Sequence, residues 1–212
     1  MKISKLYLTI YNTFQLLGWT FILAIFLYTL FFIGVRLIPI NTFNTLAFFQ
    51  TLALMEMIHI IIGIVRSPLI VTMLQYMSRI FILWFCGYIH VESQNSTITS
   101  SYVLIWSITE IIRYAYYTGK LTNTEIPFVD KLRYSAFLIL YPCGVTCEMI
   151  SNWLAMKKVN WRFRLYFKQD IRWIIYIQMT VWLFFSLSVF IYLLNQRKKF
   201  FIRDKNQSKI KI

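Results

Sequence analysis

Charged residues are scarce in this chain, and their scarcity excludes a soluble globular fold. Only 14% of the 212 residues are charged, while 58% are hydrophobic and 19% are aromatic. Soluble domains are about 45–50% apolar and roughly 25% charged. Acidic residues are the rarest, with 8 against 22 lysines and arginines, which leaves a net charge of +14. The composition predicts an integral membrane protein whose aromatic side chains meet lipid and its interface.

Histidine and cysteine are also rare, and this limits the chemistry that the chain can carry. Two histidines are too few for a histidine-box membrane oxygenase. The three cysteines are Cys86, Cys143 and Cys147, and the last two have no second pair with which to complete a zinc site. Neither Cys143 nor Cys147 is followed by an arginine six residues on, which excludes a tyrosine phosphatase nucleophile. We expect no metal and no cofactor.

Long apolar stretches are abundant, and a membrane-spanning helix needs about 20 such residues. Six stretches qualify, with approximate bounds 6–33, 42–65, 70–89, 98–117, 132–156 and 173–194. The first is too long for a signal-peptide core and has no small-residue cleavage site, so we expect it to be retained. The sequence predicts an all-α integral membrane bundle of six transmembrane helices, with residues 1–212 as a single domain.

Basic residues predict how the bundle is oriented. Six spans place both termini on one side, and both termini are basic, with Lys2 and Lys5 at the start and seven Lys or Arg residues in the tail 195–212. The positive-inside rule therefore predicts cytosolic termini. The connection 157–172 opposes this with six basic residues, whose interleaved aromatics predict an interfacial segment on lipid headgroups. This distribution accounts for the net charge, so we expect no nucleic-acid partner.

Five ionisable side chains fall inside the second, third and fourth apolar stretches, where each is costly unless paired or functional. Glu56 and His59 are three residues apart, which favours a hydrogen-bonded structural pair over direct chemistry. Glu110 and Arg113 have the same spacing and can form an intrahelical ion pair. Arg79 has no partner on its own helix, so we expect it to meet Glu56 or Glu110. A structural charge network and a substrate-contacting site both fit this set.

The fifth stretch contains the most informative segment, LYPCGVTCE at 140–148. Tyr141 and Glu148 are seven residues apart, so on a straight helix they share a face with their Cα atoms roughly 10 Å apart. Pro142 removes a backbone donor and predicts a kink, which Gly144 tolerates. Such a kink can bring a phenol and a carboxyl together on one small substrate as acid and base.

Several motifs in the chain, in order over about residues 6–150, make up a family likeness. They are Tyr11-Asn12 with Gly18-Trp19, Glu56-x-x-His59, Ser78-Arg79, Trp106-x-x-Thr109-Glu110-Ile111-Ile112-Arg113-Tyr114, Arg133-Tyr134 and Tyr141-Pro142-x-Gly144-Val145-x-x-Glu148. With these motifs the chain resembles the very-long-chain (3R)-3-hydroxyacyl-CoA dehydratases of fatty acid elongation, also called protein tyrosine phosphatase-like membrane proteins.

The resemblance implies a six-span protein of the endoplasmic reticulum membrane that removes water from (3R)-3-hydroxyacyl-CoA to give trans-2-enoyl-CoA. It implies Tyr141 and Glu148 as the catalytic pair, with either one as the base. It implies a supporting or substrate-contacting group of Glu56, His59, Arg79, Glu110, Arg113 and Tyr114. The implied partners are the acyl-CoA substrate, the lipid bilayer and other fatty acid elongation enzymes, with CoA phosphates near basic residues at the cytosolic face.

Two positions depart from the family's pattern without removing a reacting group. Cys147 stands where the family usually has glycine, and whether its larger side chain narrows the pocket is open at this point. The turn 65–68 reads Val-Arg-Ser-Pro in place of the usual Val-Pro-Ser.

Two other functions remain open at this point. One is a catalytically silent membrane scaffold or a lipid-binding subunit of the elongation complex. The other is a small transporter, which predicts inverted repeats that the sequence does not contain.

Overall fold

The computed structural model describes residues 3–88, 97–124, 126–158 and 172–210, and every regular element in these ranges is a helix. In chain order the elements are α1 (Ile3–Phe32), the 3-10 helix η1 (Val35–Leu37), α2 (Ile38–Leu52), α3 (Met55–Ile61), α4 (Leu69–Ile80), the π-helix η2 (Phe81–Tyr88), α6 (Thr97–Thr122), α7 (Pro127–Arg133), α8 (Phe137–Lys158) and α10 (Arg172–Ile210). The predicted all-α class is confirmed for the described part of the chain.

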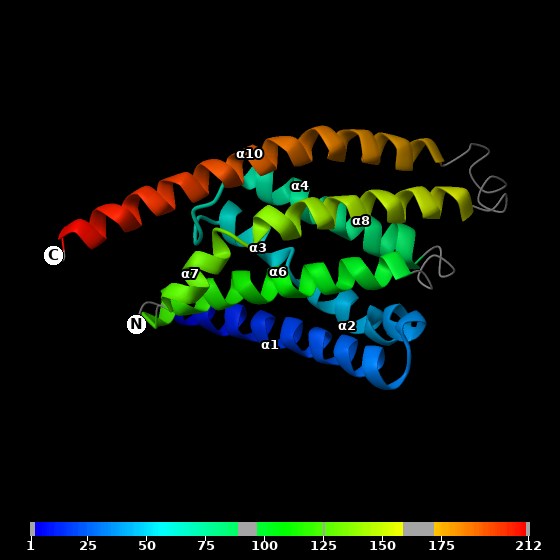
Figure 1. Ribbon diagram of the computed structural model, residues 1–212, viewed down its shortest axis with the longest axis horizontal. Helices are drawn as coiled ribbons and strands as arrows, with labels where there is room; N and C mark the ends of the chain where they lie inside the picture. Colours follow the sequence, from blue (N-terminus) through cyan, green and yellow to red (C-terminus); the bar gives the residue numbers. More distant parts are fainter. Residues whose placement is uncertain (1–2, 89–96, 125, 159–171, 211–212) are drawn as a thin grey trace.

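The long helices run lengthwise and lie side by side (Figure 1). Helix α6 is central, because it packs on α1, α2 and α8, while α10 packs on the other side of α8. The start of α1, the end of α10 and the short helix α7 lie at the same end of the bundle (Figure 1). We call this the terminal end.

Four helical stretches in the described ranges are long and apolar enough to cross a membrane. They are Ile3–Phe32, Val35–Ile61, Phe137–Leu154 and Trp173–Arg203, and a fifth stretch, Leu69–Phe85, is apolar but shorter. Helix α6 is not among them, since its buried face is polar and contains Glu110. The chain therefore has several helices suited to a membrane, and the count of six spans stays a prediction.

Two predicted boundaries differ from the structure. The stretch 42–65 is not one regular α-helix, because tighter hydrogen bonds at Ala53 and Leu54 interrupt the α-helical pattern, and α3 then ends before Gly63, whose φ of 75° is left-handed. Helix α10 runs well past the predicted end at residue 194, since no glycine or proline interrupts it and its charged residues are good helix formers. The predicted interfacial segment lies almost wholly outside the described residues.

Helix α1 buries polar side chains beside its apolar core residues and exposes apolar side chains on its outer face. Asn12 and Gln15 are buried, whereas Phe14, Leu17 and Phe21 are 47%, 63% and 58% exposed. Water would penalise such an outer surface, while lipid accommodates it and drives polar side chains to find partners within the bundle. This distribution supports a membrane location for the helices.

Helices α1 and α2 approach closely where α1 has a glycine. A Cβ atom added at Gly18 would lie 2.0 Å from the ring of Phe49 on α2. Small residues allow this kind of contact between membrane helices. The contact holds the first two helices together beside α6, which carries the polar residues of the site.

Candidate active site

A cavity of about 710 Å³ lies among the helices and is lined by residues of α1, α3, α4, α6, α8 and α10. It brings together seven of the eight side chains that the sequence singled out, namely Glu56, His59, Arg79, Glu110, Arg113, Tyr141 and Glu148. The eighth, Tyr114, is fully buried and does not line the cavity. One cavity therefore joins the predicted pair to the predicted charge network.

Glu148 lies on α8 and is only 3% exposed. Its two carboxylate oxygens accept hydrogen bonds from two indoles, Oε1 from Nε1 of Trp106 and Oε2 from Nε1 of Trp182, each at 2.9 Å. Trp106 belongs to α6 and Trp182 to α10, and both rings are buried. Because the two donors come from opposite sides, they fix the direction in which the carboxylate points.

Tyr141 lies on the same helix and lines the same cavity. Its hydroxyl donates to the backbone carbonyl of Ser186 on α10 at 3.1 Å, and its ring stacks on Phe190 with centroids 5.9 Å apart. Helix α8 continues through Pro142, which lies in its second turn. The Tyr141 hydroxyl and the Glu148 carboxyl therefore share a cavity on an uninterrupted helix.

Arg79 connects this pair to the charge network. Its guanidinium lies over the ring of Trp106, 5.2 Å from the centroid, and within electrostatic range of Tyr141 and Glu148. It also forms an ion pair with Glu110 on α6. The expected partnership of Arg79 with a carboxylate from a neighbouring helix is confirmed.

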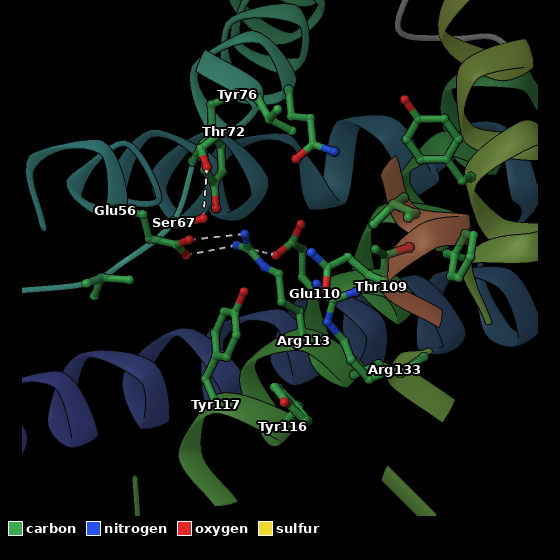
Figure 2. A pocket seen from close by; sticks show the side chains of 18 of the residues that line it. Glu56, Ser67, Thr72, Tyr76, Thr109, Glu110, Arg113, Tyr116, Tyr117 and Arg133 are labelled. Carbon is green, nitrogen blue, oxygen red and sulfur yellow. Dashed lines mark hydrogen bonds and ion pairs between the residues drawn. The ribbon is translucent and has the colours of Figure 1, made fainter. Parts of the chain in front are cut away.

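The charge network continues from α6 to α3 (Figure 2). Glu110 and Arg113 form the predicted intrahelical ion pair at 2.6 Å. Arg113 then makes a two-pronged contact with Glu56, Nη1 to Oε2 at 3.1 Å and Nη2 to Oε1 at 2.9 Å. Tyr114 donates its hydroxyl proton to the same Glu56 carboxylate at 2.5 Å. The alternating charges tie α3, α4 and α6 together around the cavity.

The predicted Glu56–His59 pair is wrong. His59 Nε2 lies 2.8 Å from the hydroxyl of Tyr7 on α1, and its ring meets the rings of Tyr7 and Tyr11 edge to face. The two residues do share a side of α3, but Arg113 offers Glu56 an ionic partner and α1 offers His59 a phenol. His59 therefore fastens α3 to α1.

The two departures from the family pattern lie in different places. Cys147 does not line the cavity but packs against the hydrophobic core, so its side chain does not narrow the pocket. Its position one residue before Glu148 turns it to another face of α8. Arg66, Ser67 and Pro68, in contrast, all line the cavity.

Sequence reasoning missed the indole donors to Glu148. Trp106 lies in a quoted motif, and its spacing to Glu110 and Arg113 is that of one helix face, which was a usable signal. Trp182 gave no such signal, since its approach to Glu148 depends on how α10 packs against α8. Among the described residues, no three His, Cys, Asp or Glu side chains are grouped as metal ligands.

The fold and the cavity define a bundle of helices, several of them long and apolar enough to span a membrane, with a buried glutamate and a tyrosine in one charged cavity. The chain belongs to the family described as protein tyrosine phosphatase-like protein, PTPLA, whose family model matches residues 50–203. The resemblance inferred from the motifs is confirmed.

Named relatives extend this assignment. The chain is 37% identical to the mouse very-long-chain (3R)-3-hydroxyacyl-CoA dehydratase 2 over 161 residues, which are 74% of this chain and 63% of the mouse protein. It is 31% identical to the rice dehydratase PASTICCINO 2B over 212 residues, which are 96% of each chain. It is 32% identical to the Arabidopsis dehydratase PASTICCINO 2 over 214 residues, which are 97% of each chain. The matched part thus spans less than two thirds of the mouse protein but nearly all of each plant protein. No solved structure matches the chain.

Proposed function

We propose that this protein is a hydro-lyase that converts (3R)-3-hydroxyacyl-CoA to trans-2-enoyl-CoA in very-long-chain fatty acid elongation. The named dehydratases to which it is similar support the reaction and the substrate. The observation that carries the proposal within this chain is the placement of Tyr141 and Glu148 in one cavity, with Glu148 held by two indole donors.

The reaction needs three contributions from the protein. The first is a base that removes a proton from C2. The second is an acid that protonates the departing hydroxyl as the C3–oxygen bond breaks, so that water leaves. The third is a group that stabilises charge on the thioester. The electrons of the C2–H bond form the new double bond between C2 and C3. Negative charge develops on the thioester carbonyl oxygen along the way, and a positive group or hydrogen-bond donor must face it.

The geometry favours Glu148 as the base and Tyr141 as the acid. Both oxygens of Glu148 accept N–H bonds, an arrangement that stabilises the ionised carboxylate, which is the form that a base must have. The Tyr141 hydroxyl is already a donor, to Ser186, and can instead donate to the C3 oxygen of a bound substrate. The proton gained by Glu148 must then return to Tyr141 before the next turnover.

Arg79 is placed to face the thioester oxygen. Its guanidinium lies over Trp106 and within electrostatic range of both members of the pair. Its ion pair with Glu110 holds it in that position. Glu110, Arg113, Glu56 and Tyr114 then act indirectly, by keeping the helices around the cavity in register.

We further propose that residues 1–212 form one domain with six spans in the endoplasmic reticulum membrane and cytosolic termini. Besides the four long apolar stretches, α6 has 26 residues and is about 39 Å long. Helix α4 continues into η2, and together they reach roughly 30 Å, the thickness of the hydrocarbon core. The tail 195–212 then projects into the cytosol, where other elongation enzymes would meet the protein.

The test is an assay of the purified protein with (3R)-3-hydroxyacyl-CoA, following formation of the trans-2-enoyl product. Wild type should turn over, while Tyr141→Phe and Glu148→Gln should not. The matched control is Tyr176→Phe, on the exposed side of α10 and outside the cavity lining, which should keep activity. Equal turnover in all four proteins would reject the catalytic pair, and an inactive wild type would favour the silent scaffold.

A further inference from the structure

The cavity has more positive than negative side chains on its walls. Its basic lining residues are Arg66, Arg79, Arg113, Lys120 and Arg133, and its acidic lining residues are Glu56, Glu110 and Glu148. Glu110 and Glu56 neutralise Arg79 and Arg113, as described above. Lys120 pairs with Asp130 at 3.1 Å.

Arg66 and Arg133 are the two basic lining residues for which no paired carboxylate has been described. Within the described part of the chain, neither guanidinium makes a hydrogen bond or an ion pair with a side chain. Arg133 is half-buried and lies within electrostatic range of Glu110, which already has two arginine partners. A half-buried cation without a counter-charge is costly, so this position suits an anion that arrives from outside.

Both arginines lie toward the terminal end of the bundle. Arg133 is the last residue of α7, and Arg66 lies in the connection between α3 and α4. Lys120, on the same part of the wall, is 14 residues beyond Trp106 on α6, which corresponds to roughly 21 Å along the helix. The backbone at Arg133 lies level with Tyr116, since the hydroxyls of Tyr134 and Tyr116 are 3.2 Å apart, and its guanidinium reaches back to within electrostatic range of Glu110.

The walls of this part of the cavity are suited to a polar ligand. In Figure 2, Ser67 and Thr72 lie on one side of the cavity, and Tyr116, Tyr117 and Arg133 lie on the other, with Arg133 extending toward Glu110. Hydroxyl groups and a guanidinium thus face the same space from two sides.

The turn that carries Arg133 is fixed by its neighbour. The ring of Tyr134 stacks on Phe200 of α10 with centroids 4.3 Å apart, and its hydroxyl lies 3.2 Å from that of Tyr116 on α6. The backbone at Arg133 is therefore anchored before any ligand binds, which lowers the entropic cost of binding.

We propose that Arg133, reinforced by Arg66, binds the phosphate groups of the acyl-CoA substrate and so fixes its direction in the cavity. Guanidinium groups suit phosphate because their planar N–H groups can contact two oxygens at once. The phosphates of CoA lie at the end remote from the thioester, so binding them at Arg133 and Arg66 directs the thioester toward Tyr141 and Glu148 in the same cavity. The inference rests on the proposed function.

The experiment compares one substrate that carries the phosphate-bearing nucleotide part of CoA with one that lacks it. Steady-state kinetics are measured with the 3-hydroxyacyl-CoA and with the matching thioester of pantetheine, which carries no phosphate. Arg133→Ala should raise KM for the CoA substrate by about 10- to 100-fold, the value of one hydrogen bond to a charged group, and leave the kinetics of the pantetheine substrate unchanged. Arg66→Ala should have a smaller effect of the same kind.

Two further variants serve as controls. Arg133→Lys should recover part of the loss, because it restores the charge but not the planar fork. Lys198→Ala, exposed on α10 at the terminal end and outside the cavity lining, should behave as wild type. Equal losses on both substrates in Arg133→Ala would overturn the proposal, and so would no change on either.

Binding of free coenzyme A to the full-length protein, measured by calorimetry, separates this inference from the proposed function. Weaker binding by Arg133→Ala than by wild type supports the phosphate site even if no turnover is found. Equal binding by the two proteins overturns it, whatever the activity assay shows.

Discussion

The indole of Trp106 donates to Oε1 of Glu148 at 2.9 Å, which joins the middle of α6 to the middle of α8 across a buried interface. The same Trp106 ring lies under the guanidinium of Arg79. One side chain therefore contacts both the proposed base and the proposed positive group at the thioester oxygen. The account predicts that this position matters for turnover more than for the fold.

Trp106→Phe should lower kcat because it removes the donor to Glu148 while keeping an aromatic ring in place. A hydrogen bond to a charged group contributes about 1.5–3 kcal/mol, so we expect a loss of roughly 10- to 100-fold. Steady-state kinetics measure the effect, and Trp182→Phe should cause a loss of the same order. Trp153→Phe, 45% exposed on α8, is the matched control and should keep full activity. An unchanged kcat in Trp106→Phe would contradict the role of the indole.

Arg113→Met should destabilise the protein strongly, because it leaves Glu56 and Glu110 without their shared partner. Breaking a buried ion pair on one side costs about 3–5 kcal/mol. Thermal unfolding in detergent should show a large fall in Tm. Lys120→Met, which breaks the more exposed pair with Asp130, should change Tm much less. Similar falls in Tm in both variants would show that the ion pairs around Glu110 stabilise the protein no more than the exposed pair of Lys120 and Asp130 does.

Cys147→Gly should leave the acyl chain-length preference unchanged, because Cys147 packs against the core and not into the cavity. Glycine inside a helix should cost about 1 kcal/mol in stability. Competition between 3-hydroxyacyl-CoA substrates of different chain length measures the preference. A shift toward longer chains in the variant would mean that this side chain does limit the pocket.

Local spacing predicted part of the site, and helix packing decided the rest. The pairs Glu110–Arg113 and Tyr141–Glu148 each lie on one helix, so the helical repeat alone places their members on a common face. His59 and Trp182 find partners on other helices, and nothing in the local sequence fixes those distances. The partner of Arg79 was predicted because a buried arginine needs a carboxylate and the chain has few.

The positions of the helices were likewise predictable from the sequence only in part. The apolar stretches indicated where α1, α6 and α8 lie, to within a few residues. The turn at Ala53 and Leu54 lies inside an apolar run without glycine or proline, so the sequence contained no signal for the break between α2 and α3. That break is nevertheless important for the site, since it begins the short helix that carries Glu56.

The most direct test of the account is whether Tyr141 and Glu148 act as a unit on one substrate. Initial rates on (3R)-3-hydroxyacyl-CoA are measured for Tyr141→Phe, Glu148→Gln and the double variant. Each single change should lower kcat by about 100-fold or more, and the double variant should be little worse than either, because residues that act together have non-additive effects. Losses that multiply in the double variant, or a single variant with wild-type turnover, would contradict the shared site.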